Sequence, residues 1–73
     1  MDPAELTNAA MKRSGLTSTR TLAAALGLAN TSVYAWMKNE KCPTFEQAYA
    51  LAELAGLPPI ETAATVRQHS PDG

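Results

Sequence analysis

Apolar residues recur every three to four positions along most of the chain, the spacing that gathers side chains on one face of an α-helix. The first such run starts at Asp2, which Pro3 and Glu5 follow; this order supplies an N-cap, a proline at the first helical position and the acid of a capping box. Gly15 suits the left-handed residue that ends a helix. The pattern predicts a helix over residues 3–14. Its expected inward residues are Leu6, Ala9, Ala10 and Met11.

Two shorter helical patterns follow. Ser18 can cap a helix over residues 19–26, which ends at Gly27. A further helix is expected from about residue 30 to residue 38, because Asn39 tolerates the left-handed conformation that ends a helix. The expected inward residues are Leu22, Ala23 and Leu26 in the first of these helices, and Val33, Trp36 and Met37 in the second.

The next stretch predicts a helix with clearly marked ends. Pro43 blocks continuation from the preceding loop, and Thr44 forms a T-x-x-Q capping box with Gln47. A helix is therefore expected over residues 45–55, closed by Gly56. Its expected inward residues are Phe45, Ala48, Leu51, Ala52 and Ala55.

Residues 60–69 predict a weaker fifth helix, because threonines lower its helix propensity, and residues 70–73 predict a frayed end. The expected inward residues are Ile60, either Ala63 or Ala64, and Val66. No stretch alternates between apolar and polar residues as a strand does. The predicted fold class is all-α, a compact bundle of four or five helices.

Length and composition place the chain among small domains without membrane contact. Its 73 residues, 45% of them apolar, are enough for one small core. Cys42 is the single cysteine and cannot form an intramolecular disulfide, and no Cys/His spacing suits a metal ion. No apolar run approaches the roughly 18 residues of a membrane span, and the start of the chain lacks a signal-peptide pattern, which predicts a cytoplasmic protein.

The chain shows no pattern of catalytic residues. His69 is the only histidine, and it stands near the expected frayed end, remote from Ser14, Ser18 and Ser32. No serine therefore has a base beside it, and the carboxylates are dispersed. The sequence predicts a protein that is not an enzyme and that uses no cofactor, metal ion or small-molecule ligand.

Residues 18–38 carry the spacing of a helix-turn-helix. Ala23 is small where two helices approach each other, and Gly27 accepts a positive φ in the turn. Five apolar residues are placed to clamp both helices to a core: Leu22, Leu26, Leu28, Val33 and Trp36. This pattern resembles the motif of the phage-repressor and Cro-like family, often called the XRE family. The stretch "PTFEQAYALAELAGL" is similar to the helix that follows the motif in that family.

The resemblance implies a lambda-repressor-like DNA-binding domain over residues 1–57. Residues 58–73 then form a C-terminal segment, in part similar to small regulators of filamentous phages and prophages. Two apolar surfaces away from the basic residues are candidate dimer contacts, the exposed end of the fourth predicted helix and the stretch "LPPIETAATV" at the start of this segment. The family places the second helix of the motif in the major groove. The base-reading residues that the resemblance implies are Asn30, Thr31, Ser32, Tyr34 and Ala35. The implied phosphate contacts are Ser18, Thr19, Arg20, Lys38, Asn39 and Lys41, followed by Lys12 and Arg13.

One position of the motif leaves two alternatives for the start of the recognition helix. Ala29 stands where the family has a capping Ser or Thr, and alanine cannot cap. In one alternative Asn30 reads bases directly. In the other, Asn30 caps the helix and leaves base reading to Thr31, Tyr34 and Ala35.

Charge is distributed unevenly along the chain, although the net charge is only -1. Residues 12–41 contain five basic residues and one acid, Glu40, whereas the remaining residues carry Arg67 and six acids. The stretch that contains the motif is therefore positive, with a net charge of +4, and the local field governs docking on phosphate.

These observations and the resemblance together predict a transcriptional regulator of a phage, prophage or bacterium, a repressor that binds an operator in double-stranded DNA. Because one helix reads only a few base pairs, a homodimer on two half-sites is expected. Two alternatives stay open: a protein-binding adaptor on the same scaffold, and a DNA-binding accessory protein of excision or replication.

Overall fold

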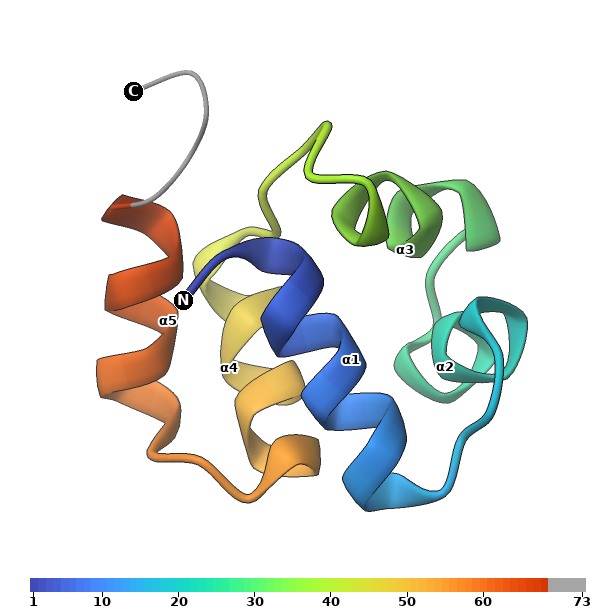
Figure 1. Cartoon of the computed structure of the whole chain (residues 1–73), viewed down its shortest axis with the longest axis horizontal. Coiled ribbons are helices and arrows are strands. Elements are labelled where there is room, and N and C mark those ends of the chain that lie inside the picture. The colour runs from blue at the N-terminus through green and yellow to red at the C-terminus, as the bar shows by residue number, and fades with distance from the viewer. Residues whose placement is uncertain (69–73) are drawn as a thin grey trace.

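The computed structural model describes residues 1–68, which form five α-helices joined by short turns (Figure 1). The helices are α1 (Pro3–Ser14), α2 (Thr19–Leu26), α3 (Asn30–Met37), α4 (Phe45–Ala55) and α5 (Pro59–Gln68). No strand occurs within these residues. The predicted all-α class is confirmed, and each helix lies within one residue of its expected bounds. His69 and the frayed end expected over residues 70–73 fall outside the described residues.

Side-chain caps explain why three of the helices begin where they do. The Asp2 carboxylate accepts the N–H of Glu5, and the Glu5 carboxylate accepts the N–H of Asp2, which completes the expected capping box of α1. The same reciprocal pair of bonds joins Thr44 to Gln47 at α4. Capping satisfies N–H groups that the helix itself leaves without partners. Local sequence therefore determines these boundaries.

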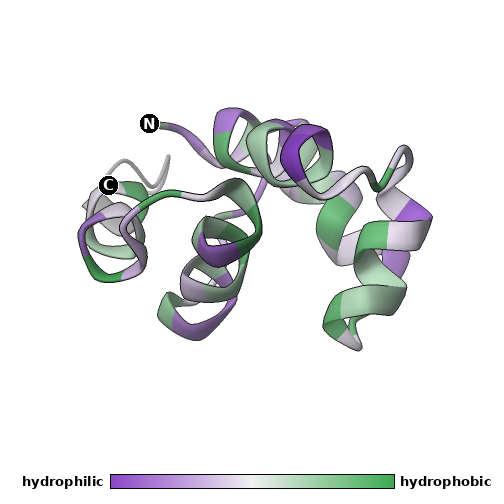
Figure 2. Ribbon diagram, turned by 90° about the horizontal axis from the view of Figure 1, so that it is seen from below, coloured by the Kyte–Doolittle hydropathy of each residue, from purple (hydrophilic) through white to green (hydrophobic). Residues whose placement is uncertain are grey.

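The helices share one core around α1 and α4. Figure 1 shows α4 between α1 and α5, with α2 and α3 on the other side of α1. Hydrophobic and hydrophilic residues alternate around the helices, as expected where each helix buries one face (Figure 2). The buried apolar side chains form a single cluster: Leu6, Ala10, Leu22, Ala23, Val33, Trp36, Ala48, Leu51, Ala52, Ala63 and Val66.

Two large apolar residues expected in the core lie at the surface. Phe45 is 37% exposed, because the inward face of α4 centres on Ala48, Leu51 and Ala52 and leaves residue 45 at its edge. Its ring instead pairs with that of Tyr49, at 6.5 Å between ring centroids. Ile60 is 66% exposed on the first turn of α5. The predictions for Phe45 and Ile60 are therefore wrong.

Other residues depart less from the burial that the sequence predicts. Five residues expected to face inward are half-buried rather than buried: Ala9, Met11, Leu26, Met37 and Ala55. Thr7 is fully buried although it is polar, because its hydroxyl donates a 2.7 Å hydrogen bond to the carbonyl oxygen of Pro3 one turn earlier. This bond satisfies the hydroxyl inside the helix, so that the side chain can pack as an apolar one.

The C-terminal helix is integrated into the core. Ala63 and Val66 are fully buried, whereas Ala64 is exposed, which decides between the two alanines expected there. The Cys42 thiol donates to the carbonyl oxygen of Val66 at 3.4 Å, which ties the loop before α4 to α5. Removing α5 would therefore uncover core residues, not only a surface segment.

Candidate nucleic-acid interface

The helix pair α2 and α3 is joined by a tight turn at Gly27. Gly27 adopts a left-handed conformation with φ of 70°, and the N–H of Leu28 returns to the carbonyl oxygen of Ala23 at 2.9 Å. Leu26 and Leu28 are half-buried and pack against the core cluster. The turn therefore holds α3 at a fixed angle to α2 and anchors both helices to the same core.

Packing of α3 leaves one face of this helix outward. Val33 and Trp36 are buried, at 0% and 2% exposure. Thr31, Tyr34 and Lys38 lie on the opposite side at intervals of three and four residues, and Tyr34 is 54% exposed. These three residues form what we call the outward stripe of α3. Of the other residues expected to read bases, Asn30 is exposed, and Ser32 and Ala35 are half-buried.

The start of α3 has no side-chain cap. Ala29 is the N-cap residue, and the helix begins at Asn30. The alternative in which Asn30 caps the helix is therefore wrong. The Asn30 side chain instead points to α2, where its oxygen accepts a 2.9 Å hydrogen bond from the Thr19 hydroxyl.

The start of α2 lies beside this pair. The Ser18 hydroxyl accepts the N–H of Thr21, and the Thr21 hydroxyl accepts the N–H of Ser18, which forms a capping box. Sequence reasoning missed Thr21, because a threonine in this position is a weaker signal than Glu or Gln. Thr19 and Arg20 follow the cap, and Arg20 is exposed. Capping uses the N–H of Thr21 and leaves the N–H groups of Thr19 and Arg20 at the helix start.

The loop after α3 carries two of the expected cations. The Lys38 ammonium lies 5.1 Å from the centroid of the Tyr34 ring and 3.7 Å from a carboxylate oxygen of Glu40. Lys41 is exposed a few residues later. The exposed cations of this face are thus Lys38, which belongs to the outward stripe, and Arg20 and Lys41 in the neighbouring elements.

Asn39 has a structural contact that the sequence did not indicate. Its φ is 57°, the one positive φ among the described non-glycine residues. Its side-chain oxygen accepts a 3.0 Å hydrogen bond from the N–H of Ala4 in the first turn of α1. The oxygen of Asn39 thus caps α1, and only its amide nitrogen is left for a phosphate.

Two of the expected phosphate contacts, Lys12 and Arg13, lie away from this face. They belong to the last turn of α1, which Figure 1 shows at the opposite end of the fold from α3. The Arg13 side chain packs over Gly56 at the end of α4, since a Cβ on that glycine would lie 2.6 Å from the Arg13 Nε. A cation there complements the C-terminal end of the α4 dipole. The structure does not bring Lys12 and Arg13 together with the outward stripe.

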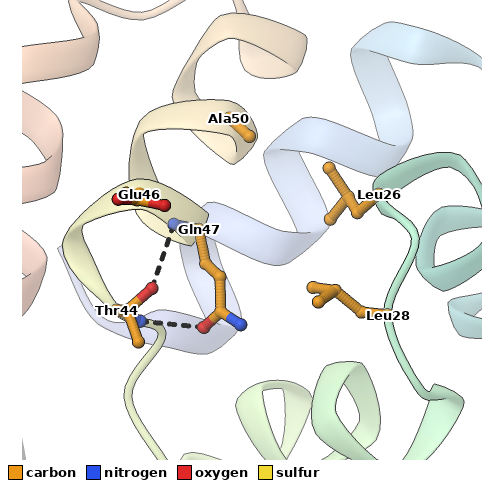
Figure 3. Close-up of a pocket in the computed structure, with 6 residues that line it drawn as sticks. All are labelled: Leu26, Leu28, Thr44, Glu46, Gln47 and Ala50. Carbon is orange, nitrogen blue, oxygen red and sulfur yellow. Dashed lines mark hydrogen bonds between the residues drawn. The ribbon is translucent and has the colours of Figure 1, made fainter.

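An open cleft of about 310 Å³ lies between the motif and α4. It is lined by Leu26, Leu28, Thr44, Glu46, Gln47 and Ala50 (Figure 3). The Thr44 hydroxyl and the Gln47 side-chain oxygen bond within the α4 cap, which leaves the Glu46 carboxylate and the Gln47 amide nitrogen as the other polar side-chain groups of the cleft. Within the described residues, no three His, Cys, Asp or Glu side chains converge as metal ligands, and no helix is long and apolar enough to cross a membrane.

Comparison with protein families identifies a helix-turn-helix in the same region of the chain. A family model described as helix-turn-helix matches residues 8–61, which contain α2, α3 and α4 completely. Searches of curated proteins and of solved structures found no match.

Proposed function

The chain belongs to the XRE-like helix-turn-helix family of DNA-binding transcription regulators, and on this premise we propose that it is a repressor that binds a specific operator in duplex DNA. The observation that carries the proposal is the outward stripe of α3. Its residues lie opposite the buried Val33 and Trp36, and this exposure supports their entry into a major groove.

The residues at the start and middle of α3 suit base recognition. Thr31 and Ala35 can present methyl groups to thymine, and Tyr34 can reach a base edge or a phosphate. The Asn30 oxygen keeps one lone pair beside the bond from Thr19, and its amide nitrogen keeps two donors. Asn30 thus retains the acceptor and donor that pair with adenine, and Ser32 lies in the same helical turn.

Phosphate contacts follow on either side of the groove. Ser18, Thr19 and Arg20 at the start of α2 supply one set, in which the N–H groups of the helix start are directed at an anion. Lys38, Lys41 and the amide nitrogen of Asn39 supply the other. Lys12 and Arg13 are left out of the proposed interface, because of their place at the far end of α1.

Specificity for an operator requires more base pairs than one helix reads, so we propose a homodimer on two half-sites about one DNA turn apart. The first turn of α5 is the proposed contact, since it carries the exposed Ile60 on the opposite side of the fold from α3. A phage or prophage origin stays a prediction from the resemblance of residues 58–73.

The test is fluorescence anisotropy of labelled duplexes taken from the DNA beside this protein's own gene, with shuffled duplexes as the control, at low and near-physiological salt. A specific regulator is expected to bind its operator duplex about a thousandfold more tightly than the shuffled duplex, or more. Weak and equal binding that salt abolishes would contradict an operator. A folded protein with no binding at either salt would favour the adaptor, and operator binding without repression of a reporter promoter would favour an excision or replication role.

A further inference from the structure

Lys38 is held by two partners at the edge of the outward stripe. Its ammonium lies over the Tyr34 ring and within 3.7 Å of the Glu40 carboxylate. The two side chains of this ion pair are 50% and 60% exposed. The carboxylate therefore lies beside the cation that is placed to meet a phosphate.

Glu40 is also the only acid between Lys12 and Lys41. The backbone places it there, because the N–H of Glu40 bonds to the carbonyl oxygen of Ala35 at 2.9 Å as the chain leaves α3. The Glu40 side chain is exposed and contributes nothing to the core. Its removal would change the charge of this face without uncovering a buried group.

We infer that Glu40 competes with DNA for Lys38. In the free protein the Glu40 carboxylate pairs with the Lys38 ammonium, and on binding a DNA phosphate takes its place. The inference rests on the proposed function, because it assigns the outward stripe to DNA. Phosphate must displace the carboxylate, and the displaced charge stays near the DNA backbone. Both effects weaken the sequence-independent part of the affinity.

The consequence concerns the affinity for DNA of any sequence. A contact from Lys38 to phosphate carries no base information, so Glu40 lowers the affinity for the operator and for other DNA by similar factors. The base contacts of α3 then account for a larger share of the binding that remains. Glu40 thus limits binding to the large excess of non-operator DNA.

The experiment compares Glu40→Gln with the wild-type chain on operator and shuffled duplexes over a range of salt concentrations. Without the carboxylate, Lys38 neutralises its phosphate with no displaced negative charge to offset it, and the slope of log K against log salt becomes steeper by about 0.9. Affinity for both duplexes rises about fivefold at low salt, an effect of the size expected for one exposed charge. Glu61→Gln on α5 removes the same charge from the far side of the fold, and is expected to change neither quantity.

A double-mutant cycle separates the pair from general electrostatics. If Glu40 acts through Lys38, Glu40→Gln tightens binding by less than about twofold in a Lys38→Gln background. Equal tightening in both backgrounds, or an unchanged salt slope, would overturn the inference. Failure to distinguish operator from shuffled DNA would refute the proposed operator, while the shuffled duplex still tests Glu40. A chain that binds no duplex, with or without Glu40, would contradict both.

Discussion

The Thr19 hydroxyl and the Asn30 side-chain oxygen are joined by a 2.9 Å hydrogen bond between the first residue of α2 and the first residue of α3. The two residues are eleven positions apart in the chain. Because both side chains are at helix starts, the bond fixes how the Asn30 amide is presented beside the outward stripe.

Loss of the Thr19 hydroxyl is therefore expected to weaken operator binding more than stability. In Thr19→Val the side chain keeps its shape, but the Asn30 amide is no longer oriented. We expect operator affinity to fall about fivefold, since one exposed hydrogen bond is worth about 1 kcal/mol. Anisotropy on the operator measures this loss. Thr62→Val on α5 is the matched control, and an equal loss in that variant would show that the Thr19 effect is not local.

The missing cap of α3 predicts a stabilising substitution. Ala29 has the extended backbone of an N-cap, with φ of -73° and ψ of 143°, but no side-chain acceptor. Ala29→Ser supplies the acceptor, and we expect the free energy of unfolding to rise by about 1 kcal/mol in urea titrations. Ala25→Ser, at an exposed position inside α2, is expected to lower it slightly. A decrease at residue 29 as well would contradict the assignment of the cap.

Asn39 has two separable roles in stability, a left-handed backbone and an acceptor for the N–H of Ala4. Asn39→Gly keeps only the backbone preference, and we expect a loss of about 1 kcal/mol. Asn39→Ala keeps neither, and the loss should reach about 2 kcal/mol. Asn39→Asp keeps both and should stay near the wild type. Chemical denaturation gives the order, and equal values for Gly and Ala would show that the backbone conformation does not matter.

The proposed dimer contact can be tested without disturbing the core. Deletion of residues 58–73 would also remove the buried Ala63 and Val66, so a surface substitution is the sharper test. Ile60→Ser is expected to weaken self-association about tenfold in sedimentation experiments, because it removes a largely exposed apolar side chain worth about 1.5 kcal/mol when buried. Tyr34→Ser is expected to leave self-association unchanged and to weaken DNA binding. Unchanged association in Ile60→Ser would exclude this contact.

The helices could be predicted closely because their ends are encoded locally. Asp2 and Glu5, or Thr44 and Gln47, are three residues apart, and the bonds between them form within a single turn. Gly56 adopts a left-handed conformation, with φ of 72°, as expected from its place after the last apolar residues of α4. Such signals depend little on the rest of the fold.

The sequence analysis was wrong or silent where tertiary packing determines which side chains are buried and which ones bond to each other. Periodicity places Phe45 close to the inward face of α4, but it does not say how wide that face is once neighbouring helices have packed. The bond from Thr19 to Asn30 and that from Ala4 to Asn39 span eleven and thirty-five positions. No local pattern indicates either bond. The geometry around the candidate site was thus predictable in its helices and not in the contacts that connect them.

Trp36 gives α3 its own fluorescent probe. It is the only tryptophan of the chain, and it lies on the inward face of α3 with 2% exposure. Its intrinsic fluorescence therefore reports whether α3 is docked on the core, while the opposite face of the same helix is left for a ligand. An emission spectrum that stays blue-shifted during a DNA titration would indicate that α3 remains docked on the core when the protein binds DNA. A red shift would reveal that the helix detaches.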